Sequence, residues 1–450
     1  MRGSAAFRTS VTPGGALAGP WVRNPLWNAA RSVPSLDLRF ADNKSLVDAT
    51  TGQNLVTFTR ASSGTYVGSD RLIKTATTNE ARFDHSPTTG ESLGLLVEES
   101  RTNLCLQSEA WDTSPWTSTA PYSVTANAIA APDGTQTADA LIVASGSSSF
   151  TTNVTRQIIT KAASALQYTR SAYFKALGST TSVRVSDFGS SAANGASAVV
   201  SLVDGSIVTA PSVAGSFSGA SVAVSNAGNG WWRVAFTYTT DTATSLTIRS
   251  FPYVGAGVLT GDGSSGLYVW GVQLEAGAFP TSYIPTTTAT VTRSADVASI
   301  TGSNFSSWYR QDEGTVFGDF TRTASTNTQQ GRVFSFSDGT NTNLLEIYQT
   351  GGSNPAAQII ATTSQAGWIA SNFTVGTSTR EVLGYQLNNT NASFNGSSET
   401  ADTVCTMPNA LTQARIGDRQ DGVRTLNGTI RRLTYFPTRL PNETLQGITQ

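Results

Sequence analysis

The stretch LYVWGVQLEAGAFPTSYIPTTTATVTRSAD, residues 267–296, decides how the chain is divided. Its first part alternates with a period of two, which is typical of a half-buried strand. The apolar face carries Tyr268, Trp270, Val272 and Leu274, and the other face carries Gln273 and Glu275. The pattern therefore predicts a strand whose inward face includes both aromatic rings, with Glu275 as a charge at the strand end.

The same stretch predicts where that strand ends. Pro280 and Pro285 lack backbone donors and stiffen the chain, so a ladder of hydrogen bonds cannot continue through them. A threonine-rich connector follows, and a second β-rich region starts after it. We therefore interpret the stretch as the closing strand of one β-sandwich joined to the tether of the next.

Composition favours folded β structure in several domains. The chain has 450 residues, too many for one core, and only 13% of them are charged, against about a quarter in average proteins. The deficit is filled by small polar residues, while 9 Trp, 19 Phe and 12 Tyr argue against disorder. A net charge of −1 gives no field that would attract nucleic acid or an anionic membrane.

The cysteines and the first residues argue against a disulfide-stabilised protein and a membrane-spanning one. Cys105 and Cys405 lie far apart in the sequence and are predicted to be buried free thiols rather than a disulfide framework. The first residues are too polar for a secretory signal, and no apolar run is long enough for a membrane span, so we expect no membrane insertion. An extracellular-looking β chain without a signal suggests release by lysis, as for virion proteins, or another export route.

The spacing of strand candidates predicts an all-β protein with two antiparallel β-sandwiches, a jelly roll and then a concanavalin A-like sandwich. Short alternating runs separated by Gly, Ser, Asn and Asp recur throughout, and no helical period competes with them. The expected segments are 1–35 (N-terminal arm), 36–105 (small β module), 106–285 (jelly roll), 286–297 (linker) and 298–450 (concanavalin A-like sandwich).

Two parts of the sequence resemble tailed-bacteriophage structural proteins. The first part is a module made of residues 57–67 (TFTRASSGTYV), 72–104 (LIKTATTNEARFDHSPTTGESLGLLVEESRTNL) and 108–111 (SEAW). The second part is the stretch 267–296, which is similar to the end of the carbohydrate-binding-module-like jelly roll in such proteins. The last third resembles laminin-G-type, concanavalin A-like sandwiches through ASFNGS, ARIGDRQDG and NGTIRRLTYFPTRL. The resemblance implies a virion protein of the fibre or decoration type and transfers no catalytic residue.

The sequence offers little for catalysis. The chain has one histidine, His85, in a turn-rich segment, where it is expected to be solvated or structural. A glycoside hydrolase needs two carboxylates that flank the bond, but Asp319, Glu346 and Glu275 stand alone. Glu98 and Glu99 are adjacent and are expected, with Arg101, to form a structural ion pair. We therefore predict no enzyme, with a tail-associated glycoside hydrolase as an alternative.

Carbohydrate binding and calcium are the remaining site hypotheses. Trp231, with Arg233 on the same strand face, is predicted to be exposed, and Trp308, Tyr309 and Trp368 lie at strand ends or beside Gly and Ser. Asp338, Asn341 and Asn343 offer oxygen ligands for Ca²⁺ in one loop, although an Asp-Gly hairpin turn is the favoured explanation of these residues. Ca²⁺ is thus the one cofactor considered. The cluster Arg415, Arg419 and Arg424 is a handle for acidic glycans or a set of ion pairs with Asp418 and Asp421.

These patterns lead to one functional hypothesis and two alternatives. The protein is predicted to be a non-enzymatic virion protein, located on the phage particle, that displays glycan-binding domains as a fibre or adhesin. Its partners would be a host surface glycan, further copies of itself, as in a trimer, and virion proteins contacted by an arm that inserts Trp21 and Trp27. The alternatives are a capsid or tail decoration protein with a packing role and the hydrolase named above.

Overall fold

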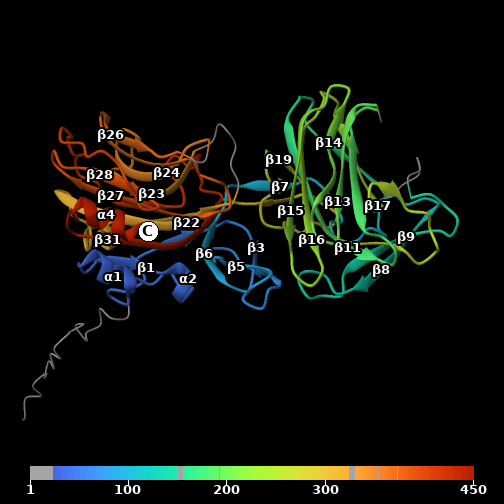
Figure 1. Cartoon of the computed structure of the whole chain (residues 1–450), viewed down its shortest axis with the longest axis horizontal. Coiled ribbons are helices and arrows are strands. Elements are labelled where there is room, and N and C mark those ends of the chain that lie inside the picture. Colours follow the sequence, from blue (N-terminus) through green and yellow to red (C-terminus); the bar gives the residue numbers. More distant parts are fainter. Residues whose placement is uncertain (1–23, 150–155, 192, 324–329, 353, 372) are drawn as a thin grey trace, which may run out of the picture.

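A computed structural model describes residues 24–149, 156–191, 193–323, 330–352, 354–371 and 373–450. Two β-sandwiches lie side by side, one coloured orange and red and the other green (Figure 1). Every strand pairing that the structure describes is antiparallel, which confirms the predicted all-β fold of two sandwiches. No helix in the described ranges is long and apolar enough to span a membrane.

The green sandwich is the jelly-roll part, with one apolar core between its two sheets. The first sheet contains β10 (Arg156–Thr160), β17 (Ser245–Val254), β12 (Ser182–Phe188), β13 (Gly195–Ser201) and β14 (Ile207–Ala214), with β18 (Gly257–Val258) on β17. The second contains β15 (Ser218–Asn226), β16 (Trp232–Thr239), β11 (Gln167–Leu177), β19 (Gly266–Ala276), β9 (Ala138–Val143) and β8 (Tyr122–Ile129).

The other sandwich is built from both ends of the chain. Its eight-stranded sheet contains β29 (Ser397–Ser398), β28 (Asn391–Phe394), β27 (Ser378–Gln386), β22 (Glu313–Arg322), β31 (Gly428–Phe436), β6 (Ser92–Val97) and β5 (Phe83–His85), with β1 (Leu36–Leu38) on β31. Its seven-stranded sheet contains β2 (Thr57–Thr59), β21 (Val297–Thr301), β30 (Gln413–Ile416), β23 (Gly331–Ser337), β24 (Asn343–Gln349), β25 (Pro355–Ala361) and β26 (Thr363–Ile369).

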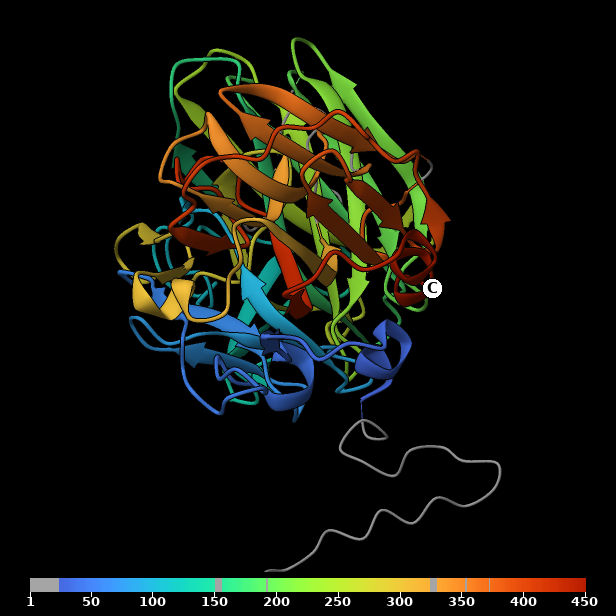
Figure 2. The same cartoon turned by 90° about the vertical axis from the view of Figure 1, so that its left-hand side faces the viewer.

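This topology corrects the predicted boundaries. Segment 36–105 is not a module of its own, because β1, β2, β5 and β6 pair within the C-terminal sandwich or with each other, and Leu36, Phe58 and Leu95 belong to its core. Figure 2 shows these blue strands against the orange and red ones. The jelly roll is therefore inserted into a sandwich that the chain begins, leaves and completes. A strand's own pattern does not reveal its pairing partner, so the sequence alone could not show this.

The insertion is joined to the sandwich by a ribbon and a buried charge cluster, so 286–297 is not a free linker. The ribbon pairs β7 (Arg101–Asn103) with β20 (Val291–Arg293). Beside it, Asp296 accepts hydrogen bonds from Arg60 (3.1 Å), Arg82 (2.5 Å) and the backbone N–H of Glu98 (2.8 Å). The Glu98 carboxylate lies 2.8 Å from Arg82 and 3.6 Å from Arg293. All five side chains are buried.

Strand β19 does not keep one inward face. Between Ser171 and Tyr173 of β11, the facing strand β19 contains one extra residue, which is a β-bulge. Gly271 lies in this bulge and adopts φ +62°. Before the bulge Leu267 and Val269 enter the jelly-roll core, and after it Val272 and Leu274 do. The prediction that Tyr268 and Trp270 face that core is therefore wrong.

A second small core forms on the outer face of the same sheet. It contains Trp270, Tyr173, Trp231 and Tyr283, with Ile73 of the β3 (Gly64–Val67) and β4 (Ile73–Ala76) hairpin packed against it. Trp270 and Tyr283 have ring centroids 4.5 Å apart. The extra residue in the bulge thus sends Trp270 outwards to attach the N-terminal hairpin.

The helices are short and cover the eight-stranded sheet and the sandwich edge. They are α1 (Pro25–Ala30), α2 (Phe40–Asn43), α3 (Ser303–Ser306) and α4 (Asn442–Ile448). Trp27 of α1 packs on a core shared with α4, and its Nε1 donates to Asp37 at 3.0 Å. Trp27 is therefore not an anchor projecting towards a partner, and Trp21 lies outside the described residues. Both cysteines are buried and free, as predicted.

We expect Asp296→Ala to destabilise the protein strongly, because it leaves Arg60, Arg82 and Arg293 in a buried site where, among the described residues, Glu98 is the carboxylate that still pairs with Arg82 and Arg293. Removing one member of a buried ionic network costs about 3–5 kcal/mol. Urea unfolding followed by tryptophan fluorescence measures the loss. The control is Asp70→Ala, which breaks the exposed pair with Lys74 and should change little. Equal effects of the two variants would contradict the assigned role.

Candidate functional site

Trp231 does not offer a surface for sugar. Its side chain is 2% exposed and belongs to the small core around Trp270. Strand β16 starts at Trp232, so the period of two does not extend back to Trp231. Arg233 donates to the Ser171 hydroxyl at 3.1 Å and to the Thr281 carbonyl at 2.6 Å. The predicted exposure of Trp231 is therefore wrong, and Arg233 is occupied in holding strands together.

Trp308 and Tyr309 also belong to a core. Trp308 is 4% exposed, and its ring centroid lies 5.0 Å from those of Phe305 and Tyr435. Tyr309 packs against the same cluster, 4.6 Å from Phe305. Both rings follow helix α3 and pack into the sandwich, so Trp308 presents no face to solvent and Tyr309 is half-buried.

Trp368 is the sugar candidate that lies at a cleft. It sits in β26, the last strand of the seven-stranded sheet, and its Nε1 donates to the Thr400 carbonyl at 2.8 Å. The cleft has a volume of about 490 Å³ and is lined by Gly367, Trp368, Ile369, Glu399, Thr400, Ala401, Asp402 and Thr403. Trp368 is 8% exposed, so it contributes a ring edge at the floor rather than an open platform.

The rim of this cleft comes from the segment after β29. Thr390 and Asp402 exchange backbone hydrogen bonds of 3.0 and 2.9 Å, and Asp402 Oδ1 accepts from the Val404 N–H at 2.8 Å. These bonds fix Glu399, Thr400 and Thr403 beside the indole. Carboxylates and hydroxyls hydrogen-bond to neutral polyols, and an indole adds an apolar contact. This rim was not predicted from the sequence; its residues are the polar run ETADT directly after the ASFNGSS hairpin.

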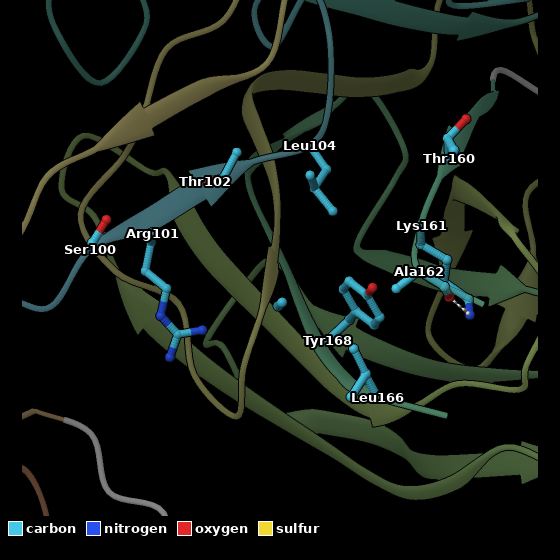
Figure 3. A pocket seen from close by; sticks show the side chains of 10 residues that line it. Ser100, Arg101, Thr102, Leu104, Thr160, Lys161, Ala162, Leu166 and Tyr168 are labelled. Carbon is cyan, nitrogen blue, oxygen red and sulfur yellow. Dashed lines mark hydrogen bonds between the residues drawn. The ribbon is translucent and has the colours of Figure 1, made fainter. Parts of the chain in front are cut away.

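A second groove lies between β7, the segment 160–168 and the end of β19 (Figure 3). Its volume is about 480 Å³, and its lining includes Leu104, Leu166 and Tyr168. The two cationic side chains at the groove, Arg101 and Lys161, already have partners within the protein. Arg101 lies 2.5 Å from Glu99 and 4.8 Å over the Phe279 ring. Lys161 donates to the Asp241 carbonyl at 2.8 Å and the Ala162 carbonyl at 3.1 Å. The groove is therefore an apolar depression rather than an anion site.

The carboxylates singled out from the sequence have structural partners. Glu99 pairs with Arg101, as predicted. Glu275 is fully buried, not a strand-end charge, and accepts from the backbone N–H of Thr281 at 3.0 Å; burial raises its pKa. For Glu98, burial opposes ionisation, but Arg293 and Arg82 outweigh it and hold its pKa at about 2. Neither environment places two carboxylates around an open cleft.

His85 and the arginine cluster are structural as well. His85 is 4% exposed, with Nδ1 3.0 Å from the Val67 carbonyl oxygen. Arg415 pairs with Asp418. Arg419 lies 3.6 Å from Glu346, which also pairs with Arg332 at 2.8 Å, and Arg424 donates to Gln330 at 2.8 Å.

The loop proposed for calcium already satisfies its own oxygens. Asp338 Oδ1 accepts from the Thr340 N–H at 2.8 Å, and Oδ2 accepts from Asn343 at 3.0 Å. Asn341 donates to Asp421 at 3.2 Å. This is the geometry of an Asx turn. Within the described ranges, no three His, Cys, Asp or Glu side chains gather as a metal site.

Comparison with known proteins gives partial structural likeness. No family model and no curated protein matches the chain. The Ruminococcus gnavus IT-sialidase CBM40 bound to alpha2,3 sialyllactose aligns with 13% identity over 31% of this chain and 84% of its own, at a TM-score of 0.28. A NanB sialidase from Streptococcus pneumoniae aligns with 16% identity over 33% of this chain and 26% of its own, also at 0.28.

Domain 4 of AbnA, a GH43 extracellular arabinanase from Geobacillus stearothermophilus, in complex with arabinotriose, aligns with 10% identity over 39% of this chain and 83% of its own, at a TM-score of 0.29. Likeness at this level says nothing of what this chain binds.

One buried carboxyl has no partner. Glu381 of β27 points into the sandwich on the side of Leu383 and Tyr385, is 0% exposed, and neither carboxyl oxygen has a hydrogen-bond partner. Burial raises its pKa well above the ordinary 4.5. A lone acid in an apolar core stays protonated because ionisation there is unfavourable.

We expect Glu381→Gln to remove a pH-dependent loss of stability. The raised pKa means that the folded state keeps a proton that the unfolded chain releases, so this stability is full below about pH 4.5 and is lost as the pH rises towards the folded pKa. The free energy of unfolding should fall by up to about 1.4 kcal/mol per pH unit in the wild type and by less in the variant.

Urea titrations between about pH 5 and about pH 8 measure both slopes. Glu443→Gln, at an exposed carboxyl of α4, is the matched control and should keep the wild-type slope. Parallel curves for Glu381→Gln and the wild type would contradict a protonated Glu381.

Proposed function

We propose that the protein is a non-enzymatic virion protein of a bacteriophage that binds glycans, and that the sugar contacts the cleft at Trp368. The observation that carries this proposal is the cleft itself. It combines an indole edge, the carboxylates of Glu399 and Asp402, and the hydroxyls of Thr400 and Thr403 at the exposed edge of a sheet. A neutral oligosaccharide, which offers hydroxyls and apolar ring faces, matches that set of groups.

Support for the virion comes from the sequence resemblance of residues 57–104 and 267–296 to phage structural proteins. In this proposal the protein lies on the particle surface, attached to other virion proteins through the N-terminal arm and assembled with further copies of itself. Since Trp27 is held in the core of this chain, anchoring does not depend on it.

A decoration protein is the second candidate, and one observation favours it. The tryptophans of the described ranges are buried, apart from Trp27 and Trp232, which are half-buried, so that part of the surface carries no fully exposed indole. Particles that lack a decoration protein would be fragile but would adsorb normally, whereas particles that lack an adhesin would be stable but fail to adsorb.

A hydrolase is the third candidate, since Glu399 and Asp402 both line the Trp368 cleft. Two carboxylates across a sugar are the requirement of glycoside hydrolysis. Release of reducing ends from host polysaccharide, abolished by Glu399→Gln, would establish this alternative.

Calcium enters the proposal as a ligand of the Asp338 loop. If Ca²⁺ binds there, calcium chloride should raise the melting temperature of the wild type and not that of Asp338→Asn, because the substitution removes the loop's one charged ligand between residues 338 and 343. Differential scanning calorimetry with calcium or with a chelator measures this shift. Identical melting under both conditions would remove calcium from the proposal.

We expect Glu399→Ala and Thr403→Ala each to weaken glycan binding about three- to tenfold, the effect of one lost hydrogen bond. A glycan array identifies the ligand, and calorimetry then measures the dissociation constants. Trp368→Phe keeps an aromatic ring and loses the bond to Thr400, so it tests the floor without opening a large cavity.

Gln53→Ala, at an exposed turn of the same sandwich, is the control and should bind normally. Unchanged melting temperatures would show that the variants are folded. Normal binding by all the cleft variants would exclude this cleft, and no binding to any glycan of a broad panel would contradict glycan binding altogether.

A further inference from the structure

The jelly roll leaves the edges of both its sheets open on one side. Strand β14 ends the first sheet and pairs only with β13 among the described strands. Strand β15 ends the second sheet and pairs only with β16. The two strands follow each other in the chain and contact each other, so the open edges lie together (green in Figures 1 and 2). We call β14 and β15 the open edge.

Strand β14 is exposed on both of its faces. All its residues are exposed except Pro211, which is half-buried. Ile207 is 50% exposed and Val213 is 45%, and Val203 in the preceding turn reaches 72%. Aliphatic side chains of this size gain most by contact with another apolar surface. The open edge therefore combines unpaired backbone groups with exposed side chains.

The usual protection of an edge strand is weak here. Edge strands are normally guarded by charges, prolines or bulges. Pro211 removes one donor from β14. Strand β15 contains no proline and no charged residue, and its register with β16 is regular from Ser221 to Asn226. The register with β16 is irregular between Ser218 and Ser221, where Gly219 adopts φ +61°, so the stretch of β15 open to another strand is Ser221 to Asn226.

The charge pattern favours an identical partner. No Asp, Glu, Lys or Arg occurs from Gly205 to Trp232. A partner of opposite charge would find nothing to attract it, while two copies of this segment meet without like-charge repulsion. An antiparallel strand is also complementary to itself, because a two-fold axis pairs the same residues from both copies.

The arrangement of the two edges adds a geometric argument. A two-fold axis normal to the sheets that pairs β14 with its copy also brings β15 to its copy, since both strands lie at the same side of the sandwich. One axis then continues both sheets into the partner. We propose that the chain forms a two-fold dimer through the open edge, in which β14 and β15 each lie beside their copy, β15 pairs antiparallel with β15 of the second copy, and the aliphatic side chains of β14 are flanked by those of the neighbouring strand.

The test is the mass of the full chain in solution. Light scattering after gel filtration, over a concentration series, should give twice the chain mass for the wild type. Ser221→Lys with Ala223→Lys should give the monomer, because the new ammonium groups of the two copies meet across the axis and both native side chains are exposed. Gln53→Lys with Thr125→Lys adds the same charge at two exposed sites, one on the other sandwich and one on β8 at the opposite end of the second sheet, and should remain a dimer.

A crosslink separates loss of pairing from loss of folding. Ala223→Cys should form a disulfide between copies on mild oxidation if β15 pairs with its copy, whereas Gln53→Cys, at an exposed site of the other sandwich, should not. The native Cys105 and Cys405 are buried and do not interfere. A monomeric wild type, a trimer, or a dimer that survives the β15 lysines would overturn the proposal, as would the absence of the Ala223→Cys crosslink. These outcomes do not depend on glycan binding.

Discussion

The buried cluster of Asp296, Glu98 and three arginines is the interaction on which the architecture depends. The chain leaves the C-terminal sandwich after β6, forms a complete jelly roll, and returns at β21. Both ends of that long insertion must be fixed at one place, which costs loop-closure entropy. Asp296 on the returning side binds Arg60 and Arg82 on the departing side, so the cluster fixes both ends. Its members are desolvated, and such groups are tolerated only when they are paired.

The bulge at Gly271 contributes a second contact between the jelly roll and the rest of the chain. It lets β19 supply Leu267 and Val269, then Val272 and Leu274, to the jelly-roll core, while Trp270 points to the opposite face. There Trp270 meets Tyr283 from the connector and Ile73 from the N-terminal hairpin. In a strand with a strict period of two, Val272 and Leu274 would point to the face opposite Leu267 and Val269. The sandwiches are thus held by an ionic cluster and by a small aromatic core.

The two surfaces that carry the functional proposals lie on different sandwiches. The Trp368 cleft is at the end of the seven-stranded sheet, and the open edge belongs to the jelly roll. A dimer formed through the jelly roll leaves both clefts free. If the proposals hold, the two clefts of such a dimer would bind a multivalent glycan more tightly than one cleft does, because the second contact becomes intramolecular. Separation of the two tasks follows from the insertion, which places a complete domain between the halves of another.

Sequence alone determined the all-β class, the two sandwiches, the buried free cysteines and the structural pairing of Glu99 with Arg101, because alternation and local spacing decide these features. Only the tertiary structure decided that β1, β2, β5 and β6 complete the C-terminal sandwich, since a strand pattern does not specify its neighbour. Tertiary packing also decided which of the predicted sugar-binding tryptophans are accessible. Trp231 and Trp308 look accessible in the sequence but are covered by residues distant from them, such as Trp270 and Tyr435. Trp368 lies at a cleft because residues 399–403, which follow β29, are held beside it by a hydrogen bond from the indole to the Thr400 carbonyl, a contact between segments that are distant in the chain.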